Sequence, residues 1–376
     1  MGRMTKRVGV IGGGQLARMM IAPASELGIE IRVLAEQDGM SAALAATAVG
    51  DYRDLDTVRA FAAGVDVVTF DHEHVPQEIL RALIADGIAV HPGPDALQYA
   101  QDKLVMREKL AEIGAPQPDW AGVSTRDELQ AFIDDHRGRA VVKTPRGGYD
   151  GKGVRVVGSA DDADDWFDAF AGERILVEEL VDFRRELAQQ VARRPSGEMV
   201  PYPVVETVQK DGVCAEVFAP APHASERTVE VAARIGTEIA GALGVTGMFA
   251  VELFETTDER LLVNELAMRP HNSGHWTQDG SVTSQFEQHL RAVLDLPLGA
   301  ADPVAEATCM INILGGPEGV GIEERFAAAM SAQPTAKIHT YGKSARPGRK
   351  VGHVNVVGDS IDDAVYAARA AAAHFD

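Results

Sequence analysis

About the first hundred residues alternate short apolar runs with stretches of helical character, and this alternation constrains the fold more than any other feature of the sequence. The apolar runs lie at residues 7–11, 29–35, 65–70 and 88–90. The stretches that we interpret as helical lie at residues 15–27, at residues 77–86 and in an alanine-rich segment after residue 36. Strands that alternate with helices at short spacing predict a parallel sheet covered by helices.

The middle of the chain has a different pattern, in which strand-like runs dominate. These runs lie at residues 140–144, 154–157, 175–181, 186–192 and 200–208. Thr125 and Glu128 have the spacing of a capping box at the start of a helix over residues 124–137. Residues 195–198 have the composition of a hairpin turn. Together these features predict an α+β region with antiparallel pairing.

The chain of 376 residues is long enough for two or three domains. From about residue 301 it returns to short strands and Gly-Pro turns, and it closes with an alanine-rich helix over residues 361–373. We therefore predict an N-terminal α/β substrate-binding domain over residues 1–103, a middle α+β domain and a small C-terminal domain. The middle domain is expected over residues 104–297, with a lid subdomain at about 118–192, and the C-terminal domain over residues 298–376.

The charge balance argues against general binding to nucleic acid, because the formal net charge is −20. An anionic substrate must therefore be held by a local basic cluster. The two cysteines, Cys214 and Cys309, lack metal-ligand spacing, and we interpret them as reduced thiols. Since no apolar stretch approaches the ~20 residues that cross a bilayer, we expect a cytoplasmic protein that makes no membrane contact.

A glycine-rich turn follows the first apolar run. Gly12, Gly14 and Ala17, with Glu36 at the end of the next run, match a dinucleotide-binding fingerprint in outline. A strand-to-helix turn also needs glycine for steric reasons alone, so a nicotinamide-dependent oxidoreductase is only one of the open alternatives. Because the rest of the chain carries a fuller nucleotide site, we interpret the turn as holding one end of a different phosphorylated substrate.

A denser glycine segment at residues 147–153 joins two strand-like runs, and Lys143 ends the first of them. Such a loop can lie across a triphosphate and present its N–H groups, while lysines neutralise the charge. A simple hairpin tip needs fewer glycines and no flanking lysines, so we predict a phosphate lid. The strand edge at residues 178–181 can offer backbone groups to adenine, and Glu186 can accept from ribose hydroxyls.

Two strand-like runs around residues 251–265 flank a polar turn and predict a hairpin. If Asp258 and Glu259 form a two-residue loop and no bulge intervenes, Glu252 faces Glu265 directly across the strands. Like charges in that position destabilise a sheet unless something compensates. Mg²⁺ binds through one or two carboxylates together with substrate phosphates, so we predict that this pair holds Mg²⁺.

Two further groups of polar residues suit anions. Arg269, His271 and Asn272 follow the Glu265 strand and supply donors that suit bicarbonate, with Arg269 able to grip it bidentately. A basic cluster near the C-terminus suits a substrate phosphate and consists of Lys343, Arg349 and Lys350. His72 and His74 are the only neighbouring histidines able to converge from one strand, and two ligands are few, so we predict no metal there.

Taken together, the lysines, the glycine loop and the acid pair resemble those of the ATP-grasp ligases. Within that superfamily the chain is similar to the 5-(carboxyamino)imidazole ribonucleotide synthases of purine biosynthesis. The matching stretches cover almost the whole chain: GVIGGGQLARM from Gly9, DHEHV from Asp71, RGGYDGKG from Arg146, NELAMRPHNSGHWT from Asn264, FEQHLRAVLDLPLG from Phe286 and YGKSARPGRKVGH from Tyr341.

The resemblance implies an activity and its partners. ATP, bicarbonate and aminoimidazole ribonucleotide would react through carboxyphosphate to give the N5-carboxylated product, ADP and phosphate. Mg²⁺ would act with ATP, and the protein would be a homodimer. One position departs from the family pattern, because Gln209 stands where the family often has histidine, which puts that contact with the nucleotide in doubt.

The resemblance also implies roles for individual residues. The catalytic set would be Arg269, His271, Asn272 and Lys143. The ATP-binding set would be Lys103, Lys143, Gly148, Tyr149, Asp150, Gly151, Lys152, Gly153, Glu178, Glu179, Leu180, Val181, Glu186, Gln209, Asn264 and Glu265. The ribonucleotide-binding set would be Gln15, Leu16, Glu73, His275, Trp276, Lys343, Arg349 and Lys350. The metal ligands would be Glu252 and Glu265.

Three alternatives stay open from the sequence. A different ATP-grasp carboxylate ligase, such as a formate-dependent purine transformylase or a biotin carboxylase, would share the ATP residues but differ at Gln15, at residues 269–276 and in the C-terminal cluster. A nicotinamide-dependent oxidoreductase would leave the pair of Glu252 and Glu265 unexplained. A non-catalytic nucleotide-binding regulator would keep the ATP site without turnover.

Overall fold

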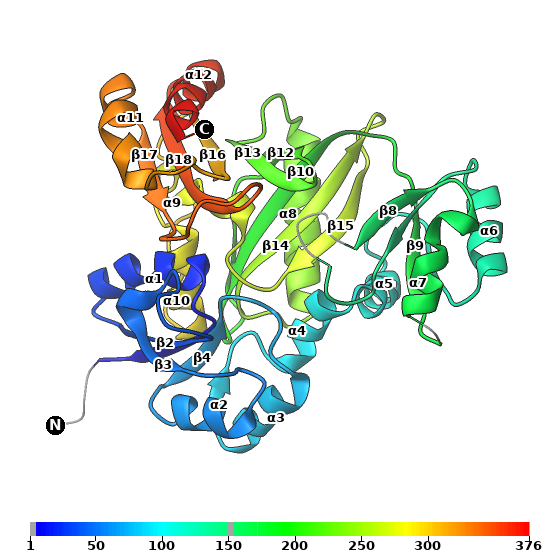
Figure 1. The fold of residues 1–376 in the computed structure, drawn as a ribbon, viewed down its shortest axis with the longest axis horizontal. Helices are drawn as coiled ribbons and strands as arrows, with labels where there is room; N and C mark the ends of the chain where they lie inside the picture. Colours follow the sequence, from blue (N-terminus) through cyan, green and yellow to red (C-terminus); the bar gives the residue numbers. More distant parts are fainter. Residues whose placement is uncertain (1–4, 149–152, 171, 376) are drawn as a thin grey trace.

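A parallel five-stranded sheet forms the N-terminal part of the computed structural model, which describes residues 5–148, 153–170 and 172–375 (Figure 1). The strand order is β3-β2-β1-β4-β5, and every neighbouring pair is parallel, as the alternating pattern predicts. The strands are β1 (Arg7–Ile11), β2 (Glu30–Ala35), β3 (Ala46–Val49), β4 (Val67–Phe70) and β5 (Ala89–Val90). The helices are α1 (Gln15–Glu26), α2 (Leu55–Ala62), α3 (Gln77–Ala85) and α4 (Pro94–Gln101).

Both faces of this sheet are covered, which explains why its strands are nearly continuous apolar runs. Val8 and Val10 pack with Met20 of α1 on one face, whereas Ile11 and Phe70 belong to the core on the other. The helical interpretation of the alanine-rich segment is wrong. Its residues form a single 3₁₀ turn, Ala43–Ala45, followed by β3, because the chain there supplies the edge strand of the sheet.

A small antiparallel sheet of order β6-β9-β7-β8 forms the lid. Its strands are β6 (Trp120–Val123), β7 (Ala140–Lys143), β8 (Val154–Val157) and β9 (Ile175–Glu179), and its helices are α6 (Arg126–Asp135) and α7 (Asp164–Ala169). The predicted capping box is confirmed, because the Glu128 N–H donates to Thr125 Oγ1 and the Thr125 N–H donates to Glu128 Oε2, both at 3.2 Å. The small sheet ends at Glu179, and the predicted lid boundary at residue 192 stays a prediction.

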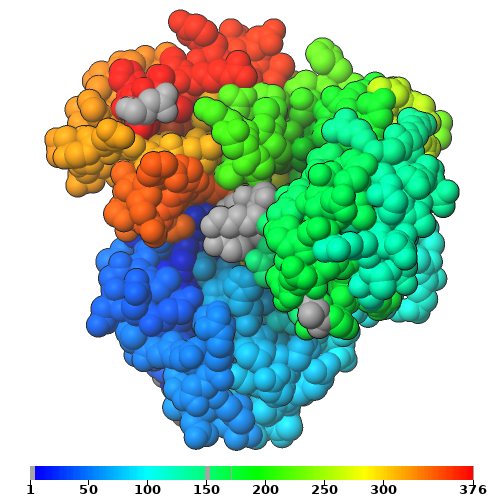
Figure 2. All heavy atoms as spheres, turned by 45° about the vertical axis from the view of Figure 1, so that its right-hand side comes forward, coloured from blue at the N-terminus to red at the C-terminus, as the bar shows by residue number. Residues whose placement is uncertain are grey.

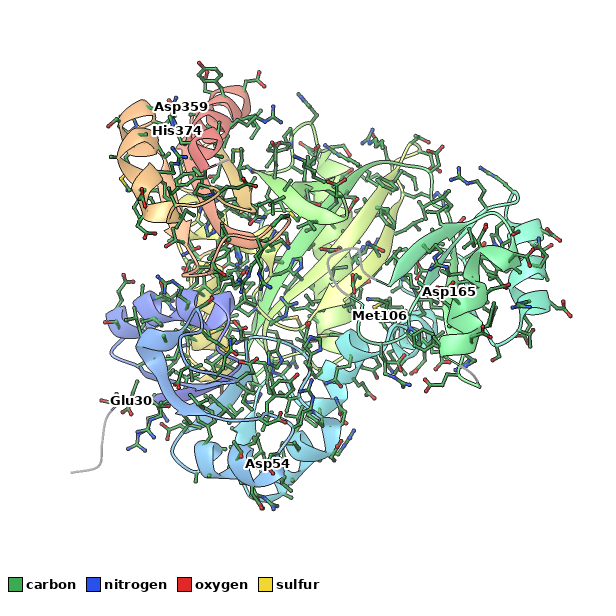
Figure 3. All side chains as sticks on the ribbon, viewed as in Figure 1. Glu30, Asp54, Met106, Asp165, Asp359 and His374 are labelled. Carbon is green, nitrogen blue, oxygen red and sulfur yellow. The ribbon has the colours of Figure 1, made fainter. Side chains whose placement is uncertain are left out.

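The third sheet has nine strands in the order β15-β14-β10-β12-β13-β16-β18-β17, with β11 paired to β10. Its strands are β10 (Phe183–Arg193), β11 (Met199–Pro201), β12 (Val205–Lys210), β13 (Val213–Ala219), β14 (Gly247–Thr256), β15 (Leu261–Ala267), β16 (Ala307–Leu314), β17 (Lys337–Thr340) and β18 (Lys350–Gly358). The remaining helices are α5 (Lys103–Glu112), α8 (Glu226–Ala242), α9 (Thr277–Gly280), α10 (Gln285–Val293), α11 (Phe326–Ala332) and α12 (Ile361–Ala372). Met106 of α5, labelled in Figure 3, marks the helix that lies between this sheet and the lid.

Two expectations about this sheet need correction. The single strand predicted over residues 200–208 is two strands, β11 and β12, because Pro203 cannot donate to the ladder. The sheet is also continuous across the predicted boundary at residue 298, since β16 pairs with β13. The C-terminal segment nevertheless has a core of its own between α12 and β16–β18. The domain limits therefore stay a prediction.

The N-terminal domain is in contact with the C-terminal segment. Arg18 of α1 donates from Nε to the Thr340 carbonyl and from Nη1 to the Ser41 carbonyl, both at 2.9 Å. The space-filling view shows the orange C-terminal segment resting on the blue N-terminal domain, with the green lid on the other side of a hollow (Figure 2).

Candidate active site

The predicted acid pair is present at the open face of the β14–β15 hairpin. Glu252 and Glu265 are direct cross-strand partners. The route to this pairing differs from the prediction in two ways. The loop holds three residues between Thr256 and Arg260, which are joined by an N–H···O bond of 3.0 Å, and a bulge shifts the register between Glu252 and Leu253. Because each deviation moves the register by one residue in opposite directions, the predicted pair survives.

The charge at this pair is unbalanced in the protein alone. Burial, followed by the carboxylates of Glu265 and Glu186, raises the pKa of Glu252 to about 8. The Lys103 ammonium, at the start of α5, bonds to Glu265 Oε1. In the described part of the chain no group of three or more His, Cys, Asp or Glu could hold a metal ion by itself. Two carboxylates with excess negative charge fit Mg²⁺ if substrate phosphates supply further ligands.

Lys143, at the end of β7, is held by a buried ion network. Its ammonium lies 2.7 Å from Glu178 Oε2 and 3.0 Å from Asn264 Oδ1. Arg107 of α5 completes the network by donating from Nε to Glu178 Oε1 at 2.7 Å. Although burial opposes it, the charges of Lys143 and Arg107 hold the pKa of Glu178 below its usual range. Glu178 therefore positions the lysine, and its predicted contact with ATP stays a prediction.

Arg107 was missed by the sequence reasoning. It is fully buried, and it also donates to the carbonyls of Val263 and Asn264 at 2.7 and 2.8 Å. One signal for it exists in the sequence. Arg107 falls three residues from both Leu104 and Leu110, so the charge stands on the apolar face of its helix, where only a paired arginine is tolerated.

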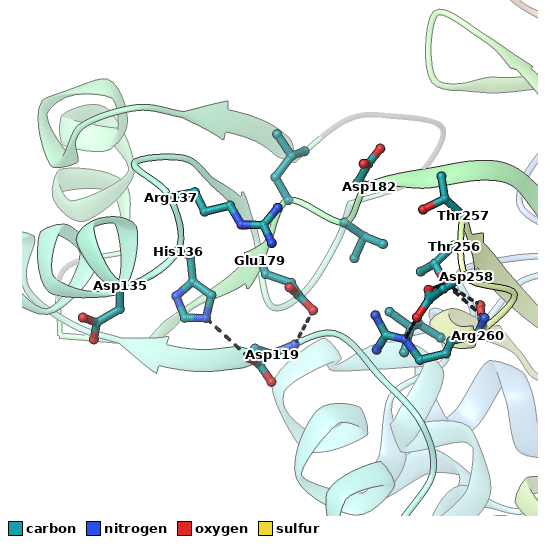
Figure 4. A pocket seen from close by; sticks show the side chains of 13 residues that line it. Asp119, Asp135, His136, Arg137, Glu179, Asp182, Thr256, Thr257, Asp258 and Arg260 are labelled. Atoms are coloured by element: carbon teal, nitrogen blue, oxygen red, sulfur yellow. Dashed lines mark hydrogen bonds and ion pairs between the residues drawn. The ribbon is translucent and has the colours of Figure 1, made fainter.

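The strand edge predicted to meet adenine borders a cavity of about 440 Å³ between the lid and the tip of the β14–β15 hairpin (Figure 4). Glu179, Leu180 and Val181 line it, and Glu179 Oε1 accepts from the Asp119 N–H at 3.1 Å. The lining does not include Lys143, Glu252 or Glu265. The cavity is thus separate from the acid pair.

The rest of the predicted ATP set lies in the lid loop and on the large sheet. Gly148 and Gly153 flank the loop, whose base is closed by the Thr144 N–H donating to the Gly153 carbonyl at 2.9 Å. Tyr149, Asp150, Gly151 and Lys152 lie outside the described residues. Burial raises the pKa of Glu186, against a hydrogen bond from Gln209, which links these two predicted nucleotide-binding residues across β10 and β12.

The predicted small-anion residues gather beside the acid pair. His271 Nε2 lies 3.5 Å from Glu252 Oε1, and Arg269 Nη2 lies 3.1 Å from Glu73 Oε2. Burial, with the charges of Arg269 and Lys350, lowers the pKa of His271 to about 3, so its imidazole is neutral. Asn272 is buried directly after it. His271 thus lies beside Glu252, whereas the guanidinium of Arg269 is paired with Glu73.

Three of the predicted ribonucleotide residues, Gln15, His275 and Lys343, meet where the first and last parts of the chain adjoin. Lys343 Nζ donates to Gln15 Oε1 at 2.7 Å, and Gln15 Nε2 lies 3.5 Å from His275 Nε2. Glu73 accepts from the Met268 N–H at 2.7 Å. These contacts bring together side chains from residues that are far apart in sequence.

Different contacts are made by Leu16, Trp276, Arg349 and Lys350 of the predicted ribonucleotide set. The side chains of Leu16 and Trp276 are packed in hydrophobic cores, and Trp276 Nε1 has no hydrogen-bond partner among the described residues. Their contact with the ribonucleotide stays a prediction. Arg349 Nη1 donates to the carbonyl and hydroxyl of Ser344. Lys350 acts on Glu252 and His271, whose pKa values it lowers. The predicted basic cluster is therefore spread along the site.

The glycine-rich turn is occupied by the protein's own carboxylates. Asp71 Oδ1 accepts from the Ala17 N–H at 2.8 Å, and Glu36 Oε2 accepts from the Gly13 N–H at 3.0 Å. Against the effect of burial, hydrogen bonds from His72 and Gly13 lower the pKa of Glu36 to about 2, so this acid stays ionised. These contacts occupy the N–H groups of Gly13 and Ala17, and the binding of a substrate phosphate at the turn stays a prediction.

Comparison with known proteins identifies the families to which the parts of this chain are similar. Three family models match consecutive parts of the chain: a ribonucleotide synthetase pre-ATP-grasp domain at residues 4–101, an ATP-grasp domain at 108–286 and a phosphoribosylaminoimidazole carboxylase C-terminal domain at 308–366. The N5-carboxyaminoimidazole ribonucleotide synthase of Mycobacterium tuberculosis H37Rv is 51% identical over 360 residues, covering 94% of this chain and 84% of that protein. The enzyme of the same name from Corynebacterium ammoniagenes is 47% identical over 374 residues, covering 97% and 91%.

Solved structures agree with this placement. The N5-carboxyaminoimidazole ribonucleotide synthetase of Thermus thermophilus superposes with a TM-score of 0.88 at 34% identity, covering 98% of both chains. The Aspergillus clavatus synthase, in complex with ADP and 5-aminoimidazole ribonucleotide, gives a TM-score of 0.89 at 31% identity over 98% of both chains. The expected combination of a parallel α/β domain, an antiparallel ATP-grasp domain and a small C-terminal part is thereby confirmed. Among the described helices none is both long and apolar enough to cross a bilayer.

Proposed function

The chain belongs to the N5-carboxyaminoimidazole ribonucleotide synthases of the ATP-grasp superfamily, and from that premise we propose that it carboxylates the exocyclic amine of 5-aminoimidazole ribonucleotide. ATP and bicarbonate are the other substrates, and ADP and phosphate are the other products. The observation that carries this proposal is the contact of His271 with Glu252 at 3.5 Å. It joins the small-anion residues to the acid pair, so bicarbonate and the terminal phosphate of ATP can meet there.

The first step activates bicarbonate. An oxygen of bicarbonate attacks the γ-phosphorus of ATP, a new P–O bond forms, and the bond to the bridging oxygen breaks so that ADP leaves. Arg269 holds the bicarbonate, and Lys143 neutralises charge that develops on the phosphoryl oxygens. Glu252 and Glu265 would hold Mg²⁺, which draws charge from the phosphates when bound. Because Glu178 and Asn264 fix Lys143 in advance, no reorganisation is needed during the step.

The second step transfers the carboxyl group. The exocyclic amine attacks the carbonyl carbon of carboxyphosphate, a C–N bond forms, the C–O bond to phosphate breaks, and the amine passes a proton to the departing phosphate. Carboxyphosphate is hydrolysed by water, so its survival depends on the lid sheet covering the site. Gln15, Glu73, His275 and Lys343 are the residues we assign to the ribonucleotide.

ADP release by the purified protein tests the proposal directly. With MgATP and bicarbonate present, release should rise strongly on addition of 5-aminoimidazole ribonucleotide, and an acid-labile carboxylated product should accumulate with it. ADP release that ignores the ribonucleotide would redirect the search to another acceptor of the same superfamily. The absence of release under all conditions would favour a non-catalytic regulator.

We also propose a cytoplasmic homodimer, which the family resemblance supports. Sedimentation equilibrium at micromolar concentration measures the assembly state directly. A mass near 40.1 kDa at all concentrations would contradict the dimer.

A further inference from the structure

A buried glutamine, Gln285, braces two histidines of the site at once. It is the first residue of α10 and is fully buried. Its Oε1 accepts from the His271 N–H at 2.9 Å, and its Nε2 donates to the His271 carbonyl at 2.9 Å. These two contacts fix which end of the side-chain amide is the oxygen, because the reversed amide would set donor against donor and acceptor against acceptor.

The second hydrogen of Gln285 Nε2 points to His275. The distance from Gln285 Nε2 to His275 Nδ1 is 2.8 Å. Since an amide nitrogen can only donate, Nδ1 must accept, and the proton of a neutral imidazole must then sit on Nε2. Burial, followed by the charges of neighbouring histidines and of Lys350, lowers the pKa of His275 well below its ordinary value, so the ring is neutral.

The resulting Nε2–H of His275 is directed toward Gln15. Gln15 Nε2 lies 3.5 Å from His275 Nε2, and Gln15 Oε1 is already bonded to Lys343 Nζ at 2.7 Å. The imidazole N–H, the amide N–H groups and the ammonium are all donors. A group of donors facing one another calls for a ligand that brings acceptors.

We propose that Gln285 is a positioning residue that fixes the Nε2–H tautomer of His275 and the backbone of His271, so that His275 presents a donor to an acceptor atom of the ribonucleotide. The inference rests on the proposed function for the identity of the ligand alone. The tautomer itself follows from the contacts of Gln285. Gln285 does not touch the substrate, and its effect passes through the two histidines.

A matched control lies one turn along the same helix. Gln288 is also fully buried, and its amide pairs with one residue in the same manner: the Gly299 N–H donates to its Oε1 and its Nε2 donates to the Gly299 carbonyl, both at 2.7 Å. Gln288 makes no contact with a site histidine in these bonds. The two glutamines thus share burial and bonding and differ in the third contact.

The pair Gln285→Glu and Gln288→Glu tests the proposal. A carboxylate at position 285 can only accept, so it would take the proton onto His275 Nδ1 and leave Nε2 bare when the ring is neutral. The KM for the ribonucleotide, relative to that of the unmodified protein, should rise about tenfold at pH 8.5. Near pH 6 the ring of His275 gains a second proton, so Nε2 again carries a hydrogen and can donate. The ratio of the two KM values should therefore fall to about twofold.

Titration of His275 in that variant is subject to the charged and titratable groups around it. These are Arg269, His271, His339, Tyr341, Lys343 through Gln15, Lys350 and His353. At each pH the KM of the variant for the ribonucleotide is divided by that of the unmodified protein. Effects that these groups and the substrate phosphate have on both proteins therefore cancel. Gln288→Glu should lower stability while leaving the KM for the ribonucleotide and its pH dependence unchanged. Equal, pH-independent effects of both substitutions would overturn the proposal.

A second measurement uses the unmodified protein and needs no activity. Nitrogen-15 spectra of histidine-labelled protein, assigned with His275→Gln, report the tautomer of His275. The Nε2–H form is expected, and the Nδ1–H form or an imidazolium at pH 7.5 would overturn the inference even if Gln285→Glu fails to fold. Failure of the proposed function is seen separately, as missing ribonucleotide dependence of ADP release with the tautomer unchanged.

Discussion

Glu252 shows how a single residue can be unfavourable for folding and necessary for the site. Its carboxyl group faces Glu265 and lies near Glu186, and burial together with these neighbours raises its pKa to about 8. The unfolded chain would ionise this group near the ordinary value of 4.5. The folded protein therefore binds more protons between these values, so this residue lowers stability progressively as the pH rises from about 4.5 to 8.

Glu252→Gln should accordingly stabilise the protein at alkaline pH while abolishing ADP release. In the absence of Mg²⁺ and nucleotide, we expect a gain of roughly 2 kcal/mol at pH 9 and almost none at pH 4.5. Urea unfolding at the two pH values measures the difference. Glu255→Gln on the same strand is the control of opposite sign, because hydrogen bonds from Arg184 and Arg185 outweigh burial and hold the pKa of Glu255 low. A loss of stability by Glu252→Gln at pH 9 would refute the electrostatic account.

Residue pairs that are close in sequence could be predicted, and those that are distant could not. Counting outward from the hairpin loop predicted that Glu252 pairs with Glu265, because a hairpin pairs residues symmetrically about its loop. Nothing comparable links Arg107 to Glu178, or Asp71 to Ala17, since those contacts depend on how separate elements pack. For Leu16 and Trp276 the motif match gives a position but not the direction of the side chain, so their contact with the ribonucleotide stays a prediction.

At the scale of elements, α5 connects the lid to the large sheet through one side chain. Arg107 reaches Glu178 of β9 and the carbonyls of Val263 and Asn264 on β15. Asn264 lies at the bulge of β15, which brings its side chain to Lys143 and keeps Glu265 opposite Glu252. The arginine therefore fixes the lysine and the bulge relative to each other. Strand-like runs in the sequence predicted β9 and β15, but the helix α5 was not predicted, and the bulge has no signature in the sequence.

Arg107→Met should lower the free energy of unfolding by about 3 kcal/mol, because it leaves Glu178 buried with only one cation. The KM for ATP should rise as Lys143 loses its fixed position. The double variant Arg107→Met/Glu178→Met replaces the buried pair by apolar groups, so it should recover stability but not the KM. Denaturant midpoints and initial rates measure both quantities. Recovery of the KM together with stability would show that the network has no positioning role.

At the scale of the whole molecule, the positions of the ribonucleotide residues depend on the contact between the N-terminal domain and the C-terminal segment. Lys343 and Gln15 are 328 residues apart, and they are brought together where Arg18 holds the carbonyl of Thr340. The parallel sheet, the antiparallel lid and the C-terminal helix were each predicted from local pattern. Their mutual placement was not, because no periodicity records which surfaces of separate sheets adjoin.

Arg18→Gln should loosen this junction without touching the substrate. We expect the KM for the ribonucleotide to rise about fivefold and the KM for ATP to stay constant, with faster amide exchange in residues 341–349. Arg369→Gln is the control, because Arg369 pairs with Glu216 at 2.7 Å and also ties a C-terminal helix to the large sheet. If both variants change the KM for the ribonucleotide equally, the effect is general loosening of the C-terminal segment and not loss of this junction.

The carboxylate at the start of α1 has a consequence for how such sequences evolve. A Cβ on Gly14 would lie 2.0 Å from Asp71 Oδ2, so no larger residue fits while the acid remains. Asp71 also accepts a hydrogen bond from the Ala17 N–H. A larger residue at position 14 would push the carboxylate away and break that bond. A larger residue at position 14 therefore requires a change at Asp71 as well. A glycine fingerprint of this kind can thus persist through divergence because of an internal pairing, without any dinucleotide being bound.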